Sequence, residues 1–120
     1  MFTCNIANIY APNSKSDKLI FFNELAEMCT EDCDDDLLMF GDFNCVLDNS
    51  SDIVSGKPHG SVEVNAFNNM LNKMELCDVW RSFHENEKDF TWNRTNPFIA
   101  RRLDYCLASV NILPNCVNCV

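Results

Sequence analysis

The sequence lacks the long apolar stretches and the basic leader that would direct a chain into or across a membrane. Its uninterrupted apolar runs are only a few residues long, far short of the roughly 20 that cross a bilayer. The N-terminus reads Met-Phe-Thr-Cys-Asn-Ile and has no basic stretch followed by an apolar core, so it does not resemble a secretory signal. We therefore expect an intracellular protein, nuclear or cytoplasmic and not secreted, with no membrane partner.

Basic residues are also scarce. Nine Lys and Arg stand against 18 Asp and Glu, which gives a net charge of −9. This balance argues against a protein that binds nucleic acid through a simple basic footprint. Acidic clusters such as residues 31–36 usually form solvated surface, but acids held in a cleft can bind a divalent cation, which reverses the local charge toward phosphate. Whole-chain charge leaves both interpretations open.

Cysteine, in contrast, is abundant, with eight residues in 120. Because nothing indicates export, we expect reduced thiols that pack as small hydrophobes rather than a disulfide scaffold. Two close pairs have a spacing seen among zinc ligands, but more than eighty residues separate one pair from the other, unlike a compact zinc motif. These pairs are Cys29 with Cys33 and Cys116 with Cys119.

The hydrophobic pattern alternates between strand and helix periodicities in a chain that is 47% apolar. Such an order predicts one α/β domain in which helices cover at least one face of a sheet. The second helix should bury Val62 and Phe67 among others, and the apolar run at 37–40 is typical of a strand buried on both faces. The expected elements are a strand at 2–10, a helix from Ser16 to about Cys29, a strand at 37–40, an exposed loop at 49–60, a helix from Ser61, and strands at 90–92 and 99–107.

Polar residues follow the predicted strand at 37–40, in the run Gly41-Asp42-Phe43-Asn44. Gly41 permits an unusual backbone turn, and residues beyond it would project from the C-terminal edge of the sheet, where α/β proteins tend to bind ligands. Asp42 could orient a water or hold a metal, and the Asn44 amide could donate to a phosphate oxygen. The alternative is a plain turn, since Gly, Asp and Asn are all turn residues.

Other candidate residues lie at or near strand ends. Tyr10 and Asn13 could meet a phosphate, or could mark a simple strand-ending turn. Strand alternation places Arg102 and Asp104 on one face, where an inward Asp would need a histidine or metal partner; alternatively they form a surface pair worth at most about 1 kcal/mol. Thr91 offers a hydroxyl but is a common strand residue.

Five motifs in one order resemble the endonuclease/exonuclease/phosphatase superfamily. The resemblance looks closest to the endonuclease region of LINE-type retrotransposons, which accompanies a reverse transcriptase and is similar to apurinic endonucleases and exonuclease III. It extends over residues 5–109. The motifs are Tyr10-Ala11-Pro12-Asn13, Gly41-Asp42-Phe43-Asn44, Asp78-Val79-Trp80-Arg81, Phe90-Thr91-Trp92 and Arg102-Leu103-Asp104-Tyr105.

The resemblance implies a four-layer α/β sandwich of the DNase I-like type, with mixed sheets and flanking helices. It implies hydrolysis of a DNA phosphodiester assisted by Mg²⁺ or Mn²⁺. By this resemblance, Asp42 would activate the attacking water and contact the metal, and Asn44 would stabilise the pentavalent phosphate. Asp104 would orient a catalytic histidine, and the catalytic Tyr10 would contact the phosphate, as would Asn13. Thr91 and Arg102 would support the site or bind phosphate and DNA.

Two features of the family pattern are missing from the 120 residues. The family's N-terminal half carries the Glu that is the chief Mg²⁺ ligand, and a Ser-Asp-His motif follows the Arg-Leu-Asp-Tyr segment. Neither His59 nor His84 follows Ser-Asp, and both are expected at the surface. We therefore expect residues 1–120 to form an incomplete sandwich, weak or inactive alone, with an exposed sheet face that favours self-association.

Three functions are compatible with the sequence. The first is part of a nuclease that nicks DNA in its complete form, which the aromatic context of Trp80 and of Phe90-Thr91-Trp92 favours. The second is a phosphatase of the same superfamily that acts on a small phosphorylated substrate. The third is a non-catalytic remnant that acts as an interaction module.

Overall fold

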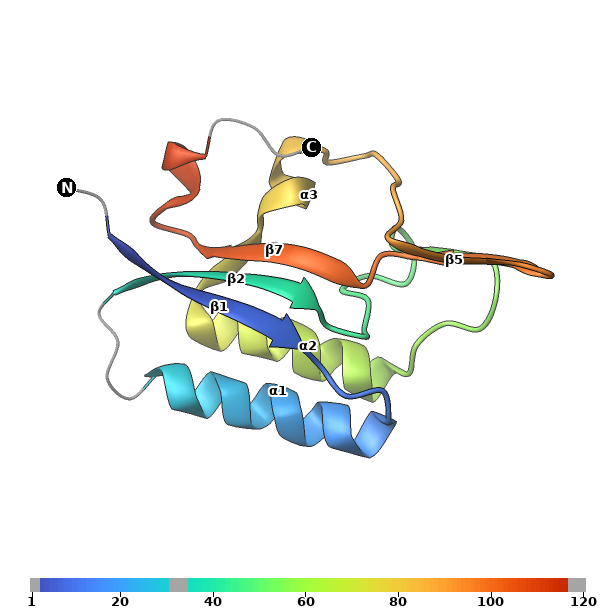
Figure 1. The fold of residues 1–120 in the computed structure, drawn as a ribbon, viewed down its shortest axis with the longest axis horizontal. Helices are drawn as coiled ribbons and strands as arrows, with labels where there is room; N and C mark the ends of the chain where they lie inside the picture. The colour runs from blue at the N-terminus through green and yellow to red at the C-terminus, as the bar shows by residue number, and fades with distance from the viewer. Residues whose placement is uncertain (1–2, 31–34, 117–120) are drawn as a thin grey trace.

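The computed structural model describes residues 3–30 and 35–116, which form a mixed α/β structure (Figure 1). Its main sheet has the strand order β1-β2-β7-β4. β1 runs parallel to β2, whereas β7 is antiparallel to both β2 and β4. This mixed sheet confirms the predicted fold class. The strands are β1 (Cys4–Tyr10), β2 (Asp36–Asp42), β4 (Leu76–Asp78) and β7 (Asp104–Ser109).

Two helices, α1 (Lys15–Thr30) and α2 (Ser61–Met74), lie side by side on one face of the main sheet. The short α3 (Val79–Phe83) and the 3₁₀ helix η1 (Leu113–Asn115) lie on the opposite side (Figure 1). Among the described residues, none of the helices has the length and apolar character needed to cross a membrane.

A second, three-stranded sheet forms an arm that projects beyond the main sheet (Figure 1). Its strand order is β3-β6-β5, and both pairings are antiparallel. β5 (Trp92–Thr95) and β6 (Phe98–Arg101) make a hairpin, and β3 (Ile53–Val54) pairs with β6. The segment at 49–60, predicted to be an exposed loop, therefore contributes a strand. The predicted strand at 99–107 is also divided, because residues 102 and 103 separate β6 from β7.

The core lies between the main sheet and the two long helices. Phe22 of α1 and Phe67 of α2 are fully buried and stack with ring centroids 4.8 Å apart. Phe43 stacks on Phe67 from the loop after β2, at 5.1 Å. Each fully buried ring contributes roughly 1.5–3 kcal/mol. This aromatic stack fixes the loop after β2, which carries Asn44 and directly follows Asp42, against the helices.

The helix boundaries are close to those expected. α1 begins one residue before Ser16, and Ser14 caps it: the Asp17 backbone N–H donates to the Ser14 hydroxyl oxygen at 3.2 Å, as capping residues commonly do. α2 begins at Ser61 as predicted. The prediction that Val62 faces the core is wrong, because Val62 is 52% exposed and the neighbouring Glu63 is buried instead.

The prediction that β2 is buried on both faces is wrong for the described residues. Met39 points into the core and is fully buried, but Phe40 on the opposite face is 40% exposed. Ile6 and Tyr10 of the neighbouring β1 share this face by strand alternation and are exposed as well. The apolar run in β2 therefore reflects one core-facing side and one open side of the sheet.

The cysteines agree in part with expectation. Free thiols are present at Cys4, Cys45, Cys77, Cys106 and Cys116. The two zinc-like pairs each include a residue outside the described part of the chain, Cys33 and Cys119, and most of the acidic run at 31–36 lies outside it too.

Candidate functional site

Two aspartates meet where strands β2 and β7 pair. Asp42 is the last residue of β2, Asp104 is the first of β7, and the antiparallel register places them directly opposite each other. Directly paired residues project from the same face, with Cβ atoms typically about 4.5–5.5 Å apart, and like charges in this position repel. Both side chains line one pocket of about 640 Å³. Two carboxylates are therefore held together where these two inner strands meet the loops at one end of the sheet.

The backbone on both sides of Asp42 has positive φ angles, at Gly41 and at Asn44. Gly41 has a φ of +138°, and a Cβ at this position would overlap the carbonyl oxygen of Ile9, so only glycine suits the position. Asn44 adopts the left-handed region with a φ of 48°. Its backbone N–H donates to Asp42 Oδ1 at 2.9 Å, which orients the Asp42 carboxylate.

Asn44 also joins the loops that follow β1 and β2. The side-chain Nδ2 of Asn44 donates to the carbonyl oxygen of Ala11 at 2.6 Å, and the backbone carbonyl oxygen of Asn44 accepts from Lys18 Nζ at 2.9 Å. The Ala11 N–H donates to the Asp42 carbonyl at 2.8 Å. The amide of Asn44 has two N–H bonds and one carbonyl oxygen, so it keeps hydrogen-bonding capacity toward a ligand.

Asn13 and Tyr10, the other residues predicted after β1, differ in their placement. Asn13 lines the same pocket as Asp42 and Asn44. Tyr10 is 80% exposed and is not among the lining residues of that pocket. The β1–β2 register nevertheless pairs Tyr10 with Asp42, so Tyr10 lies at the pocket's edge. Its predicted contact with phosphate stays a prediction.

Thr91 supports the backbone beneath Asp104. Its Oγ1 accepts from the backbone N–H groups of Leu103 at 3.0 Å and Asp104 at 3.1 Å. Its own N–H donates to the Arg101 carbonyl at 3.0 Å. Thr91 also lines the pocket. This geometry suits the supporting role predicted for Thr91, because it fixes the start of β7.

Arg102 is placed differently from the prediction. It is only 4% exposed, and its Nε donates to Asp52 Oδ1 at 2.8 Å while its terminal nitrogens reach Asp78 at 2.6 and 3.1 Å. Burial opposes its charged form, but the hydrogen bonds that its guanidinium donates to Asp78 and Asp52 outweigh burial and raise the pKa of Arg102. Because β6 ends at Arg101, strand alternation does not extend through Arg102 to Asp104. The structure therefore gives Arg102 a buried ion-pair role rather than a phosphate-binding one.

The neighbouring Arg81 extends this ion-pair network. Its guanidinium donates to Asp52 at 2.9 Å, and the guanidinium carbons of Arg81 and Arg102 lie 4.9 and 5.1 Å from the Trp80 ring centroid. Asp78 and Arg81 both belong to a network that joins the loop after β2, the start of α3 and the short segment between β6 and β7.

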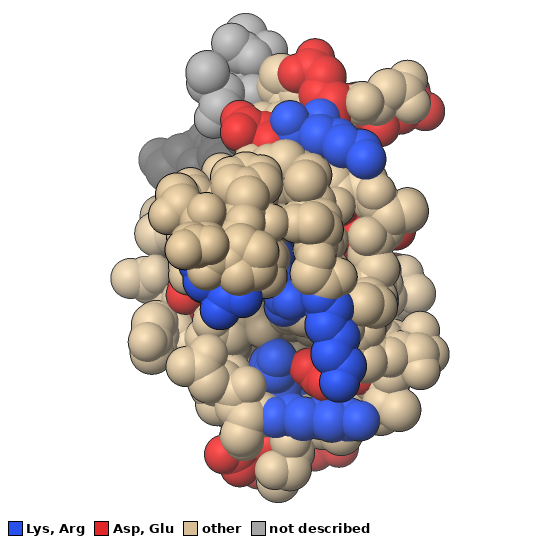
Figure 2. All heavy atoms as spheres, turned by 90° about the vertical axis from the view of Figure 1, so that its right-hand side faces the viewer, with Lys and Arg blue, Asp and Glu red and all other residues tan. Residues whose placement is uncertain are grey.

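Basic residues surround the pocket although the chain as a whole is acidic. Lys18 and Arg101 line it, and Figure 2 shows Lys and Arg side chains gathered around a hollow on the face at the arm end of the molecule. Sequence reasoning missed these two residues although both lie close to a motif in the chain, because Lys18 falls within helix α1 and Arg101 within a strand of the arm, and neither belongs to a motif itself. The local charge suits an anionic ligand.

His59 also lines the pocket, which corrects its assignment as an exposed loop residue. Burial, together with the positive charges of Arg101 and Lys18, lowers the pKa of His59 from 6.5 to about 4, so the ring is neutral at pH 7. Its position just before α2 was the available signal, since helix N-termini often border ligand sites. His84 stacks on Trp80 at 4.7 Å and lies 3.1 Å from Glu87.

The aspartate pair fits a hard divalent cation. Mg²⁺ binds oxygen ligands and is often held by only one or two carboxylates, with waters and substrate phosphates completing its shell. The structure gives Asp42 one hydrogen bond, through Oδ1, so within the described residues Oδ2 remains available. A cation between Asp42 and Asp104 would also relieve the repulsion between them.

Comparison with solved structures shows the same arrangement of elements in known nucleases. An AP endonuclease from Archaeoglobus fulgidus matches with a TM-score of 0.79 and 24% identity, over 94% of this chain and 52% of that one. The chain has the AP endonuclease fold. The catalytic domain of APE2 from Xenopus laevis also has this fold, with a TM-score of 0.64 and 22% identity over 88% of this chain and 40% of that one. The AP endonuclease LMAP from Leishmania major matches at a TM-score of 0.58 and 14% identity, over 82% and 35%.

The AP endonuclease fold confirms the DNase I-like architecture that the motifs predicted. By sequence, the chain is 36% identical over 93 residues to the "Transposon TX1 uncharacterized 149 kDa protein" of Xenopus laevis. No family model matches the sequence. The chain spans about half or less of the matched structures, and 7% of the transposon protein although the match covers 77% of this chain.

Proposed function

We propose that residues 1–120 form part of a metal-dependent nuclease domain that cleaves DNA phosphodiesters, in a protein of retrotransposon origin. The observation that carries this proposal is the convergence of Asp42, Asn44 and Asp104 on one pocket with a basic rim. The AP endonuclease fold and the likeness to a transposon protein support it.

The pocket residues divide the work of phosphodiester hydrolysis between them. Asp42, oriented by the Asn44 N–H, accepts a proton from the attacking water. The Asn44 amide and Lys18 donate to the oxygens of the pentavalent phosphate, whose extra charge needs preorganised donors. Asp42 and Asp104 would hold Mg²⁺ or Mn²⁺, which when bound supplies Lewis-acid stabilisation of that charge.

Thr91 and Asn13 act on the rim of the site. Thr91 fixes the backbone of Asp104 through its two accepted hydrogen bonds, so it is a positioning residue. Asn13 presents an amide to the phosphate from the loop after β1, and the exposed Tyr10 hydroxyl approaches from the edge of the pocket. We assign these contacts to binding rather than to proton transfer.

We propose that the domain with full activity is longer than these 120 residues. Within the described residues, Asp104 receives no side-chain hydrogen bond from a histidine, and the open face of the main sheet carries exposed Ile6 and Phe40. In the longer domain a second layer covers this face, and a histidine meets Asp104. Alone, the 120-residue chain nicks DNA weakly or not at all and associates with itself through the same face.

A plasmid-nicking assay tests the proposal. The full product of the reading frame that contains these residues should convert supercoiled plasmid to open circles with Mg²⁺ and not with EDTA. Asp42→Asn and Asn44→Ala should lower the rate at least about a hundredfold, as expected for groups that act only in the transition state. Asp17→Asn and Asn65→Ala make the same chemical changes on exposed helix positions and should nick at the parental rate.

Three results would remove the proposal. The first is metal-independent nicking, or nicking that survives Asp42→Asn. The second is release of phosphate from a small phosphomonoester at a rate that exceeds plasmid nicking, which would favour the phosphatase alternative. The third is failure of both reactions in a folded full-length protein, which would leave the non-catalytic interaction module as the function.

A further inference from the structure

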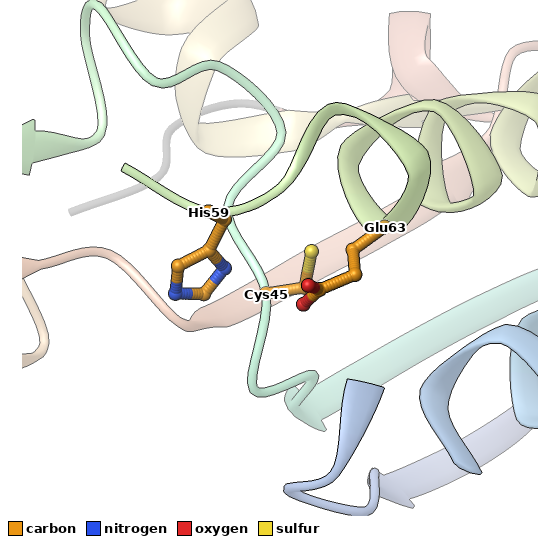
Figure 3. A group of neighbouring side chains, drawn as sticks. All are labelled: Cys45, His59 and Glu63. Atoms are coloured by element: carbon orange, nitrogen blue, oxygen red, sulfur yellow. The ribbon is translucent and has the colours of Figure 1, made fainter. Parts of the chain in front are cut away.

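A cluster of three possible metal ligands lies beside the pocket, between the loop after β2 and the start of α2. Cys45, His59 and Glu63 each offer one donor atom, and these atoms all lie within 4.8 Å of one another. Figure 3 shows a ring nitrogen of His59 turned toward the Cys45 thiol and the Glu63 carboxylate. Three segments therefore present sulfur, nitrogen and oxygen to one point.

The His59 ring is held ready for a ligand that the described residues do not supply. Its Nδ1 is buried and has no hydrogen-bond partner among them, which is costly for a polar atom. Asn49 fixes the backbone on both sides: Nδ2 donates to the His59 carbonyl and Oδ1 accepts from the His59 N–H, both at 3.0 Å. The ring is neutral at pH 7, as its lowered pKa requires, and a neutral imidazole is the form that binds metals.

Cys45 and Glu63 complete a donor set with a suitable charge. Cys45 is fully buried, and this burial raises the pKa of its thiol to about 12, so it keeps its proton until a cation displaces it. Glu63 Oε2 accepts from Lys18 Nζ at 2.8 Å, and Lys18 is also tied to the Asn44 carbonyl. Lys18 can therefore stay on Oε2 while Oε1 binds a metal, the kind of outer hydrogen bond that orients ligating carboxylates.

We propose that Cys45, His59 and Glu63 bind a divalent transition-metal ion, for which Zn²⁺ is the best chemical match, with a water in the fourth position. Zn²⁺ accepts this mixture of thiolate, imidazole and carboxylate, whereas Mg²⁺ prefers oxygen ligands alone. As the Sγ–metal bond forms, the S–H bond of Cys45 breaks and its proton passes to solvent. The thiolate and the carboxylate together balance the charge of the ion.

The site differs from the one proposed for phosphodiester cleavage. It shares no metal ligand with the Asp42–Asp104 pair, although His59 borders both. A bound ion would join the loop that carries Asn44 to the first turn of α2, so its role would be to fix the rim of the pocket rather than to react.

Co²⁺ is the probe, because a cobalt–thiolate bond gives a near-ultraviolet charge-transfer band and tetrahedral Co²⁺ absorbs strongly in the visible. The chain, prepared without a histidine tag and with reduced thiols, should bind one Co²⁺ that gives both bands, and Zn²⁺ should displace that ion. His59→Gln and Glu63→Gln should weaken binding by more than about a hundredfold, beyond the loss seen for outer-shell residues. Cys45→Ser should abolish the thiolate band.

Matched variants make the same chemical changes elsewhere. His84→Gln, Glu75→Gln and Cys77→Ser should each bind Co²⁺ as the parent does, and Asp42→Asn should leave both bands unchanged. Circular dichroism checks that each variant is folded, and His59→Gln is the decisive one because His59 lies outside the core. The site is disproved if Co²⁺ does not saturate the folded parent, if no thiolate band appears, or if His59→Gln binds as tightly as His84→Gln.

Discussion

Replacing Arg102 by leucine should be among the most damaging single changes in this molecule. The substitution removes three charge-assisted hydrogen bonds, one to Asp52 and two to Asp78. Asp52 keeps a bond from Arg81, but Asp78 loses both side-chain contacts to a cation. Breaking a buried ion pair by removing one partner costs roughly 3–5 kcal/mol, and we expect Arg102→Leu to lower the free energy of unfolding within that range.

Urea denaturation followed by tryptophan fluorescence measures this loss, because Trp80 packs against the Arg102 guanidinium. Arg94→Leu makes the same chemical change on the exposed strand β5 and should shift the free energy of unfolding by no more than about 0.5 kcal/mol. Carboxylates left without a cationic partner, rather than lost side-chain volume, cause the expected loss of stability.

A second substitution separates these two causes. In the parent, Asp78→Asn should destabilise, because it weakens the bonds to Arg102. In the Arg102→Leu background the same Asp78→Asn should stabilise, because it removes an unpaired buried charge and still caps α3, since asparagine caps helices well. If Asp78→Asn has the same sign in both backgrounds, or if Arg102→Leu costs no more than Arg94→Leu, the ion-pair explanation is refuted.

Three further measurements follow from the site. Gly41→Ala should cost at least about 2 kcal/mol of unfolding free energy in urea melts, because it adds backbone strain and a Cβ that overlaps Ile9; a loss below 1 kcal/mol would contradict this. Asp42→Asn should stabilise the chain in EDTA by up to about 1 kcal/mol by removing the repulsion from Asp104, and should abolish any stabilisation by Mg²⁺; destabilisation in EDTA would argue against the repulsion. The pKa of His59 is lower in the folded chain than its ordinary 6.5, so the unfolded chain binds more protons below that pH and stability should fall as the pH drops from 6.5 to about 4. His59→Gln should remove that part of the decline in pH-dependent urea melts, and an unchanged decline would show that other groups cause it.

The first two strands and the two long helices could be predicted because local hydrophobic periodicity defines them. The same pattern placed Asp42 after a strand and Asp104 within one, but their pairing across β2 and β7 depends on residues far apart in the chain. The DNase I-like fold was expected from the resemblance of five ordered motifs to a known superfamily, and not from periodicity.

The predictions that failed depended on partners far away in the chain. Arg102 is buried because Asp52 and Asp78, 50 and 24 residues away, neutralise it, and no local pattern reveals such a pairing. Val62 was expected to be buried, but the neighbouring Glu63 is buried in its place, because Lys18 of the other helix forms an ion pair with Glu63. His59 seemed exposed in a polar loop, yet the loop folds back through β3 and Asn49. Burial of a polar group depends on tertiary partners, which periodicity does not report.

The hairpin of β5 and β6 has both ends of its base in the pocket wall, through Thr91 and Arg101. Thr91 also holds the main chain of Leu103 and Asp104 by two hydrogen bonds. The start of β7, and with it the backbone of Asp104, is therefore held from the arm through Thr91 as well as from β2 through the strand pairing. The spacing of the two carboxylates thus depends on residues of both sheets.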